Sequence, residues 1–144
     1  PTNVSESNTF GIIASVEETF SIGDYANIKW GMNYTFLKTS NSTGAVSKYL
    51  ADHPMHNFNF MASVMTPIVD LSLYSQWIRR NEESLIGINA DIFPNYSVTH
   101  LKLDVKPFGD QFSFFMKVHN LFGADYQAVV GVQEARSFGY PLKY

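Results

Sequence analysis

The chain has 144 residues and a net charge of −3, and 15% of its residues are aromatic but only 16% are charged. An average soluble domain has about 25% charged residues, so this composition is low in charge for a soluble protein. The chain has no cysteine, which excludes a disulfide framework and a thiolate metal site. It has no basic cluster either, which argues against nucleic acid as a partner.

Alternating apolar and polar residues predict strands from the start of the chain. Residues 10–20 form the first such segment, and residues 25–38 form the most regular one. The second is long enough to cross a membrane, which takes about 9 to 11 tilted residues of strand. No apolar run approaches the roughly 20 residues of a membrane helix, so a membrane-spanning form of this chain would be built from strands.

Five further strands are predicted, at residues 54–64, 71–80, 99–106, 112–119 and 136–144. Tight turns are predicted at residues 21–24, 67–70 and 107–110. Long connections are predicted at residues 39–53, 81–95 and 121–135. Short turns therefore alternate with long loops, which is typical of up-and-down membrane barrels with short periplasmic turns and long extracellular loops.

The expected fold is thus all-β, an antiparallel up-and-down transmembrane β-barrel, to which residues 1–144 contribute about seven strands as its C-terminal part. Closed bacterial barrels have an even number of strands, about eight or more. The odd count and the start at Pro1 lead us to expect further strands on the N-terminal side.

The last eight residues alternate strictly, with an aromatic-rich face that ends on Tyr144. Their pattern resembles the C-terminal signal that the barrel-assembly machinery recognises. The positions of that signal are Ser137, Gly139, Leu142 and Tyr144. The alternative interpretation is a plain edge strand at the end of a soluble β-domain.

Residues 118–126, which include Asn120-Leu121-Phe122, together with Gly131 and Arg136, resemble the C-terminal end of TonB-dependent outer-membrane receptors. Residues 11–17 and the stretch from Tyr34 through Pro54 and His56 resemble further strands of that family. One departure is Glu134-Ala135-Arg136, where the family usually has Pro-Gly-Arg. The resemblance implies that the chain is the last third of a barrel of about 22 strands.

The resemblance also implies a function, which is active uptake of a scarce ligand across the bacterial outer membrane. Ligands of this family include ferric siderophores, haem, cobalamin and oligosaccharides. The implied partners are outer-membrane lipid, a small-molecule ligand such as a metal chelate, the barrel-assembly machinery, and TonB through an N-terminal region that this chain does not contain. No cofactor, resident metal or catalytic arrangement is expected, and the chain is not expected to be an enzyme.

Four residues in or next to the long loops, which are expected to be extracellular, are candidate ligand contacts: His53, Arg79, Arg80 and Tyr126. For His53, the alternative is a loop cap at the start of a strand. For the two arginines, the alternative is a solvated charge cluster with Glu82 and Glu83. A polar face that includes His100 and Lys102 could form an ion pathway, although polarity is the default for a barrel lumen.

The apolar phase of the strands predicts which side chains face lipid. They are Ile28, Trp30, Met32, Phe58, Phe60, Leu101, Leu103, Phe112 and Phe114. Two other classes of protein share part of this pattern. One is a passive porin or adhesin barrel, and the other is a soluble lipocalin-like binding barrel.

Overall fold

A computed structural model describes residues 7–41, 53–82, 93–131 and 134–137. Within these ranges the chain forms only β-strands, and no helix there is long and apolar enough to span a membrane. The strands are β1 (Ser7–Ile22), β2 (Ala26–Asn41), β3 (Pro54–Met65), β4 (Val69–Arg80), β5 (Asn95–Val105), β6 (Pro107–Asp110), β7 (Phe114–Val118), β8 (Gln127–Gly131) and β9 (Glu134–Ser137).

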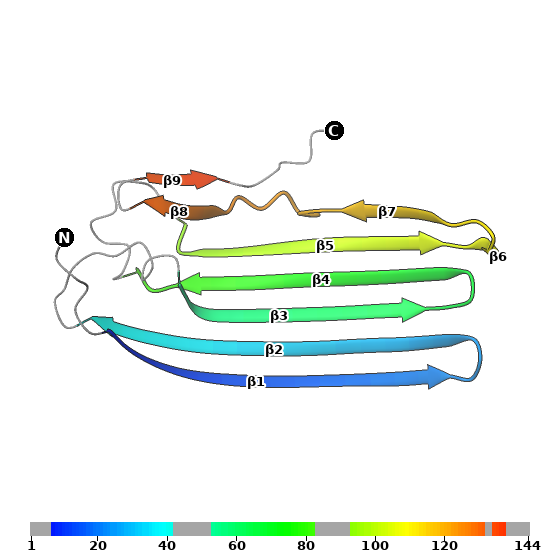
Figure 1. The fold of residues 1–144 in the computed structure, drawn as a ribbon, viewed down its shortest axis with the longest axis horizontal. Helices are drawn as coiled ribbons and strands as arrows, with labels where there is room; N and C mark the ends of the chain where they lie inside the picture. The colour runs from blue at the N-terminus through cyan, green and yellow to red at the C-terminus, as the bar shows by residue number, and fades with distance from the viewer. Residues whose placement is uncertain (1–6, 42–52, 83–92, 132–133, 138–144) are drawn as a thin grey trace.

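Six of these strands form one antiparallel sheet in the order β1-β2-β3-β4-β5-β7 (Figure 1). Each strand pairs with the strand before and after it in the sheet by simple up-and-down connections, as the sequence predicts. The sheet is not closed, because β1 and β7 are its two edges. The all-β, antiparallel, up-and-down part of the prediction is therefore confirmed.

The short connections lie together at one end of this sheet (Figure 1). At the β3–β4 turn, the Thr66 hydroxyl accepts a hydrogen bond from the Val69 N–H at 2.8 Å and donates one to the Val69 carbonyl at 2.8 Å. Gly23 and Gly109 adopt positive φ angles of 54° and 65° in the other two, a conformation that glycine adopts without steric cost. The ends of β2 and β4 and the starts of β3 and β5 lie at the opposite end, where the long connections are predicted.

The predicted boundaries differ most from the structure between β5 and β7. Residues 107–110, predicted as a tight turn, form β6, and β7 begins only at Phe114, so Phe112 lies outside the strands. Pro107 has no N–H to donate, which helps to end the β5 ladder at Val105. Phe112 instead packs its ring edge-on against Phe114, with the centroids 4.8 Å apart.

The third predicted connection, residues 121–135, is not all loop. It contains β8 and the start of β9, which pair with each other as a separate two-stranded sheet. The described part of the predicted final strand ends at Ser137 and pairs with β8, not with β7. Gly139, Leu142 and Tyr144 lie outside the described residues, so their proposed role as an assembly signal stays a prediction.

The register places the apolar positions of neighbouring strands on a common face, which we call the apolar face. Met32 pairs with Phe60, for example, and Leu71 pairs with both Val64 and Leu103. Leu71, Leu73 and Trp77 of β4 also fall on this face, although the alternation of β4 is less regular in sequence. All predicted lipid-facing residues except Phe112 lie on it.

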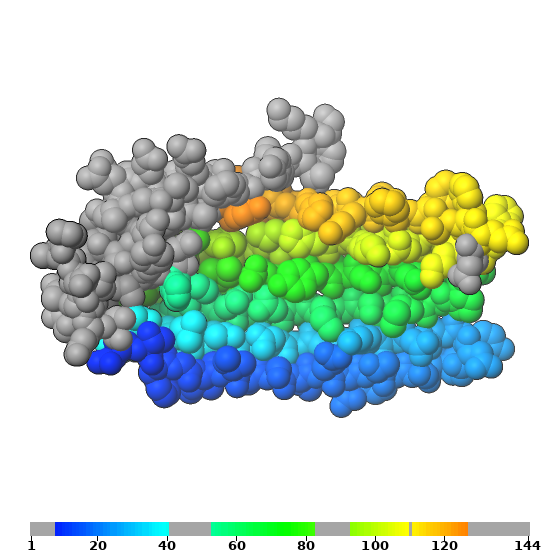
Figure 2. All heavy atoms as spheres, viewed as in Figure 1, coloured from blue at the N-terminus to red at the C-terminus, as the bar shows by residue number. Residues whose placement is uncertain are grey.

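The opposite face, which we call the polar face, carries most of the charged and amide side chains of the strands. The strands of the sheet lie side by side (Figure 2), and among the described residues only Ile78 and Val98 are buried apolar side chains. Large apolar residues such as Phe10, Ile12 and Phe20 are more than half exposed. The described part of the sheet therefore has only a small core, and its apolar face is a large exposed apolar surface of the kind that marks an interaction site.

A compact turn follows β7 at Asn120-Leu121-Phe122-Gly123-Ala124. Asn120 has a positive φ of 54° and is only 3% exposed, and its side-chain amide exchanges two hydrogen bonds with the backbone of Ala124, both at 2.9 Å. The Leu121 N–H donates to the Thr99 carbonyl at 2.7 Å, which ties the turn to β5. Asparagine suits this position because it tolerates the left-handed conformation and bonds its own backbone.

Replacing Asn120 tests this turn. Asn120→Ala removes both side-chain hydrogen bonds, and alanine, unlike asparagine, has no side-chain hydrogen bond to offset the cost of a positive φ. The substitution should therefore lower the free energy of unfolding of the full-length protein by about 2–3 kcal/mol. Asn120→Gly removes the same bonds but accepts the φ angle, so it should cost about 1 kcal/mol less. Urea unfolding measures both. Equal effects of the two substitutions would contradict the account of the φ angle.

Candidate functional site

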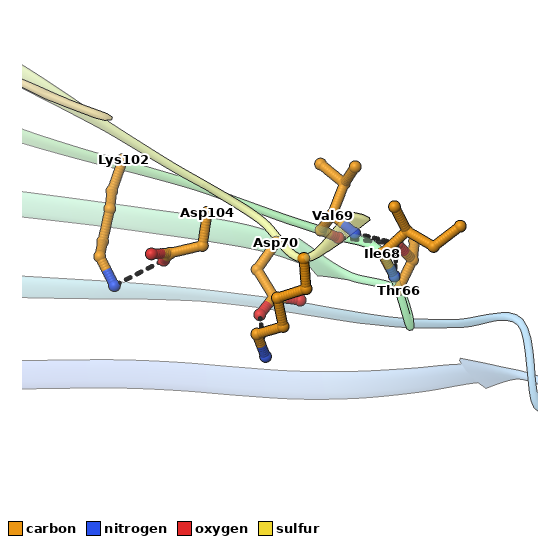
Figure 3. Close-up of polar contacts among 7 residues, drawn as sticks. Thr66, Ile68, Val69, Asp70, Lys102 and Asp104 are labelled. Carbon is orange, nitrogen blue, oxygen red and sulfur yellow. Dashed lines mark hydrogen bonds and ion pairs between the residues drawn. The ribbon is translucent and has the colours of Figure 1, made fainter. Parts of the chain in front are cut away.

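The polar face of the six-stranded sheet carries a ladder of ion pairs near the short turns. Glu17 contacts Lys29 at 2.5 Å across β1 and β2, and Lys102 contacts Asp104 at 2.7 Å along β5. Asp70 of β4 contacts Lys106 at 3.3 Å. Figure 3 shows Lys102, Asp104 and Asp70 projecting to one side of the sheet, and Val69 to the other.

Every side chain of these ion pairs is partly exposed. Exposed ion pairs contribute about 0–1 kcal/mol each, so their role in stability is small. Their effect is electrostatic: positive and negative groups balance one another on this face. A surface of this kind is well hydrated and interacts with polar molecules through many weak contacts.

Two hollows open in the polar face on either side of the cross-strand pair Met61 and Tyr74. One has a volume of about 310 Å³ and lies over Gly31, whose missing side chain leaves space between Glu17 and Met61. The other has a volume of about 300 Å³ and lies over Ser63 and Ser72, which are small. Both hollows are shallow and open, so they suit parts of a ligand or of another polypeptide rather than an enclosed small molecule.

Tyr74 is the centre of a hydrogen-bonded and stacked group that lines both hollows. Its hydroxyl donates to the Asn59 amide oxygen at 2.8 Å, and its ring stacks on His100 with centroids 6.0 Å apart. His100 in turn meets the edge of His119 at 5.2 Å, and the Asn120 N–H donates to His100 Nδ1 at 3.4 Å. The group presents aromatic rings together with polar edges, which is a chemistry suited to binding polar organic ligands.

A second cluster surrounds Arg80, at the end of the sheet opposite the short turns. This residue is 3% exposed, and its guanidinium lies over the Tyr96 ring at 5.1 Å and donates to the Phe93 carbonyl at 3.2 Å. The Arg80 N–H also donates to the Pro94 carbonyl at 2.8 Å. Tyr96 stacks on Tyr126 with centroids 5.6 Å apart, so the cluster joins the ends of β4, β5 and the segment before β8.

The structure separates the four predicted ligand contacts. Arg80 and Tyr126 come together through Tyr96, whereas Arg79 points to the apolar face and forms an ion pair with Glu82 at 3.9 Å. His53 is exposed, just before β3. The alternative of a solvated charge cluster fits Arg79 but is wrong for Arg80, because the strand turns neighbouring side chains to opposite faces and Arg80 is covered by Tyr96.

Tyr96, Tyr74 and His119 are the site residues that sequence reasoning missed. Tyr96 precedes the regular part of its strand in sequence, and its role depends on the pairing of Ile78 with Tyr96, which places it beside the end of β4. No sequence pattern reveals such a cross-strand neighbour without the register. Among the described residues, no three histidine, aspartate or glutamate side chains gather in a way that could hold a metal ion.

Comparison of the chain with known proteins leaves its family open. No protein-family model, no curated protein and no solved structure matches it.

The cluster around Arg80 gives a testable difference between two adjacent arginines. Arg80→Lys keeps the charge but loses the planar contact with Tyr96 and the bond to Phe93, so it should lower the free energy of unfolding by about 1–3 kcal/mol. Arg79→Lys is the matched control, and it should cost less than about 0.5 kcal/mol because Arg79 is exposed. Thermal unfolding of the two full-length variants measures this, and a larger effect of Arg79→Lys would contradict the assignment.

Proposed function

We propose that this chain is the C-terminal part of an outer-membrane transport barrel that takes up a scarce ligand, such as a ferric chelate, with energy delivered by TonB. The observation that carries the proposal is the division of one up-and-down sheet into an apolar and a polar face, with its short connections at one end. Outer-membrane barrels are built in this way, with lipid on one side of the wall and water or a plug domain on the other.

The small size of the core supports the membrane part of this proposal. A soluble sandwich or barrel covers its apolar face with a second layer, but the apolar face of this sheet is covered by nothing in the described residues. Strands contributed by other parts of a longer chain would pair the edges at β1 and β7 and close the barrel. Closure satisfies the backbone groups of both edges, which lipid cannot do.

The Asn120-Leu121-Phe122 turn supports the transporter class within the outer-membrane barrels. The resemblance to TonB-dependent receptors includes this motif, and in the structure it is a compact turn tied to β5. The polar face, with its balanced charges and two hollows, then lines the interior of the barrel. A plug domain or a passing ligand would meet hydrogen-bonding groups there, with apolar surface between them in the hollows.

An arginine placed on each face tests the lipid-facing assignment. Leu103 lies on the apolar face beside Leu71 and Met116, so Leu103→Arg near the middle of the membrane should cost about 2–4 kcal/mol in the full-length barrel. Ser72→Arg, on the polar face of the neighbouring strand, is the matched control and should cost less than about 1 kcal/mol. Reversible urea unfolding in lipid vesicles measures both costs. A larger cost for Ser72→Arg would mean that the two faces are assigned the wrong way round.

Uptake by the full-length protein tests the transport class. Cells that carry it as their only outer-membrane receptor are given a panel of ferric hydroxamate, catecholate and citrate chelates labelled with radioactive iron. Active transport predicts accumulation of at least one chelate, and its loss when a protonophore collapses the inner-membrane gradient or when TonB is deleted. A steady open conductance of the purified protein in planar bilayers, with TonB-independent uptake, would instead support a passive porin.

A further inference from the structure

Three basic side chains lie on the apolar face at the end opposite the short turns. Lys38 of β2, His56 of β3 and Arg79 of β4 all lie on that face, and His56 and Arg79 are register partners. The register partner of His56 on β2 is Phe36, so Lys38 lies two residues, about 7 Å, further along β2 than the level of His56 and Arg79. Two strand spacings of about 4.8 Å separate β2 from β4, so the Cα atoms of Lys38 and Arg79 lie about 12 Å apart. Lys38 and Arg79 are both exposed.

Aromatic residues lie directly next to His56 and Arg79 on the side of the short turns. Tyr34, Phe58 and Trp77 are register partners across β2, β3 and β4, and they form the adjacent row of the same face. A ring of Trp and Tyr beside an apolar band is typical of the level where a membrane meets its headgroups. His56 and Arg79 therefore lie one step beyond the aromatic level, and Lys38 lies two steps beyond it, away from the apolar band.

His56 is held in a fixed position by its neighbours on β2. The Tyr34 hydroxyl lies 2.7 Å from His56 Nδ1, and the His56 ring stacks on Tyr34 and packs against Phe36, with centroids 6.1 and 5.2 Å apart. A β-bulge between Pro54 and His56 shifts the register at this point. The imidazole is thus positioned by its neighbours, while the long side chains of Lys38 and Arg79 can reach toward a charged group on either side.

We propose that Lys38, His56 and Arg79 form a binding site for the phosphate groups of outer-leaflet lipids. This inference rests on the proposed membrane orientation, in which the apolar face meets lipid. Cationic side chains next to an anionic leaflet each contribute about 1 kcal/mol of attraction, and arginine binds phosphate oxygens in a bidentate geometry. The site would fix the vertical position of the barrel and recruit specific lipids to its wall.

The two described carboxylates nearest to Lys38 and Arg79, or on the same face, are Glu82 and Glu18. Glu82 is 3.9 Å from Arg79, and both side chains are at least half exposed, so their attraction is weak and a phosphate can compete for the guanidinium. Glu18 also lies on the apolar face but pairs with Trp30, eight residues along β2 from Lys38, which is about 26 Å. The described carboxylates therefore leave Lys38 and Arg79 able to bind an anion supplied from outside the chain.

Lipid retention by the full-length protein tests the site. The protein is purified from outer membranes, exchanged into detergent with phosphatidylcholine, and titrated with diphosphorylated lipid A, and bound lipid is counted by native mass spectrometry. Lys38→Gln with Arg79→Gln should weaken lipid A binding by about 30-fold. The matched control, Lys102→Gln with Lys117→Gln, removes two cations from the polar face and should change binding by less than about twofold.

A conservative exchange, Lys38→Arg with Arg79→Lys, keeps both charges and should retain binding, which separates lost charge from damaged folding. Equal losses in the glutamine pair and its polar-face control would overturn the site, as would unchanged binding in the glutamine pair. A site that takes inorganic phosphate as tightly as lipid A would overturn the assignment to lipid. Recovery of the full-length protein in a soluble fraction would overturn both the proposed function and this inference, whereas an inserted barrel with unchanged lipid binding would overturn only the inference.

Discussion

The register between neighbouring strands is the constraint on which the rest of the structure depends. Side chains alternate between faces with a period of two, so a slip of one residue would move the whole apolar set of a strand to the polar face. β1 and β2 remain in register without interruption from Ser7 and Asn41 to Ile22 and Ala26. This continuity is what turns separate amphipathic segments into one wall with two different surfaces.

The ion pairs and the cluster around Arg80 depend on the same register. Glu17 and Lys29 meet because they occupy nearly opposite positions on the polar face of β1 and β2, and Tyr96 covers Arg80 because Ile78 pairs with Tyr96. Turn chemistry fixes the register at the ends. Two hydrogen bonds between Thr66 and Val69 hold the β3–β4 turn, and Gly23 adopts the positive φ that the β1–β2 turn has.

Much of this fold follows from the sequence because alternation is a local signal. Residues 25–38 show the pattern of β2 without reference to any other part of the chain, and the glycines and prolines mark the turns. Boundaries were less predictable where two local preferences compete. Residues 107–110 carry turn residues yet form β6, and the apolar run Ala128-Val129-Val130 forms a strand inside a predicted loop because β-branched residues favour extended backbone.

The candidate site was less predictable than the fold because it consists of cross-strand neighbours. Arg79 and Arg80 look equivalent in sequence, but a strand turns them to opposite faces, where one meets Glu82 and the other meets Tyr96. Tyr74 and His100 likewise share a surface only through the pairing of β4 with β5. Charged and aromatic residues can be chosen from a sequence, but which of them meet is a property of the pairing.

The nearest-neighbour order of the sheet has a consequence for how the chain acquires its structure. Every pairing in the six-stranded sheet joins a strand to one that is adjacent in the chain, apart from the short β6 between β5 and β7, so each hairpin can form from local contacts alone. Local contacts form quickly, since little chain entropy is lost in closing a short loop. The sheet can therefore grow by one strand at a time, with the most recent edge acting as the template for the next strand.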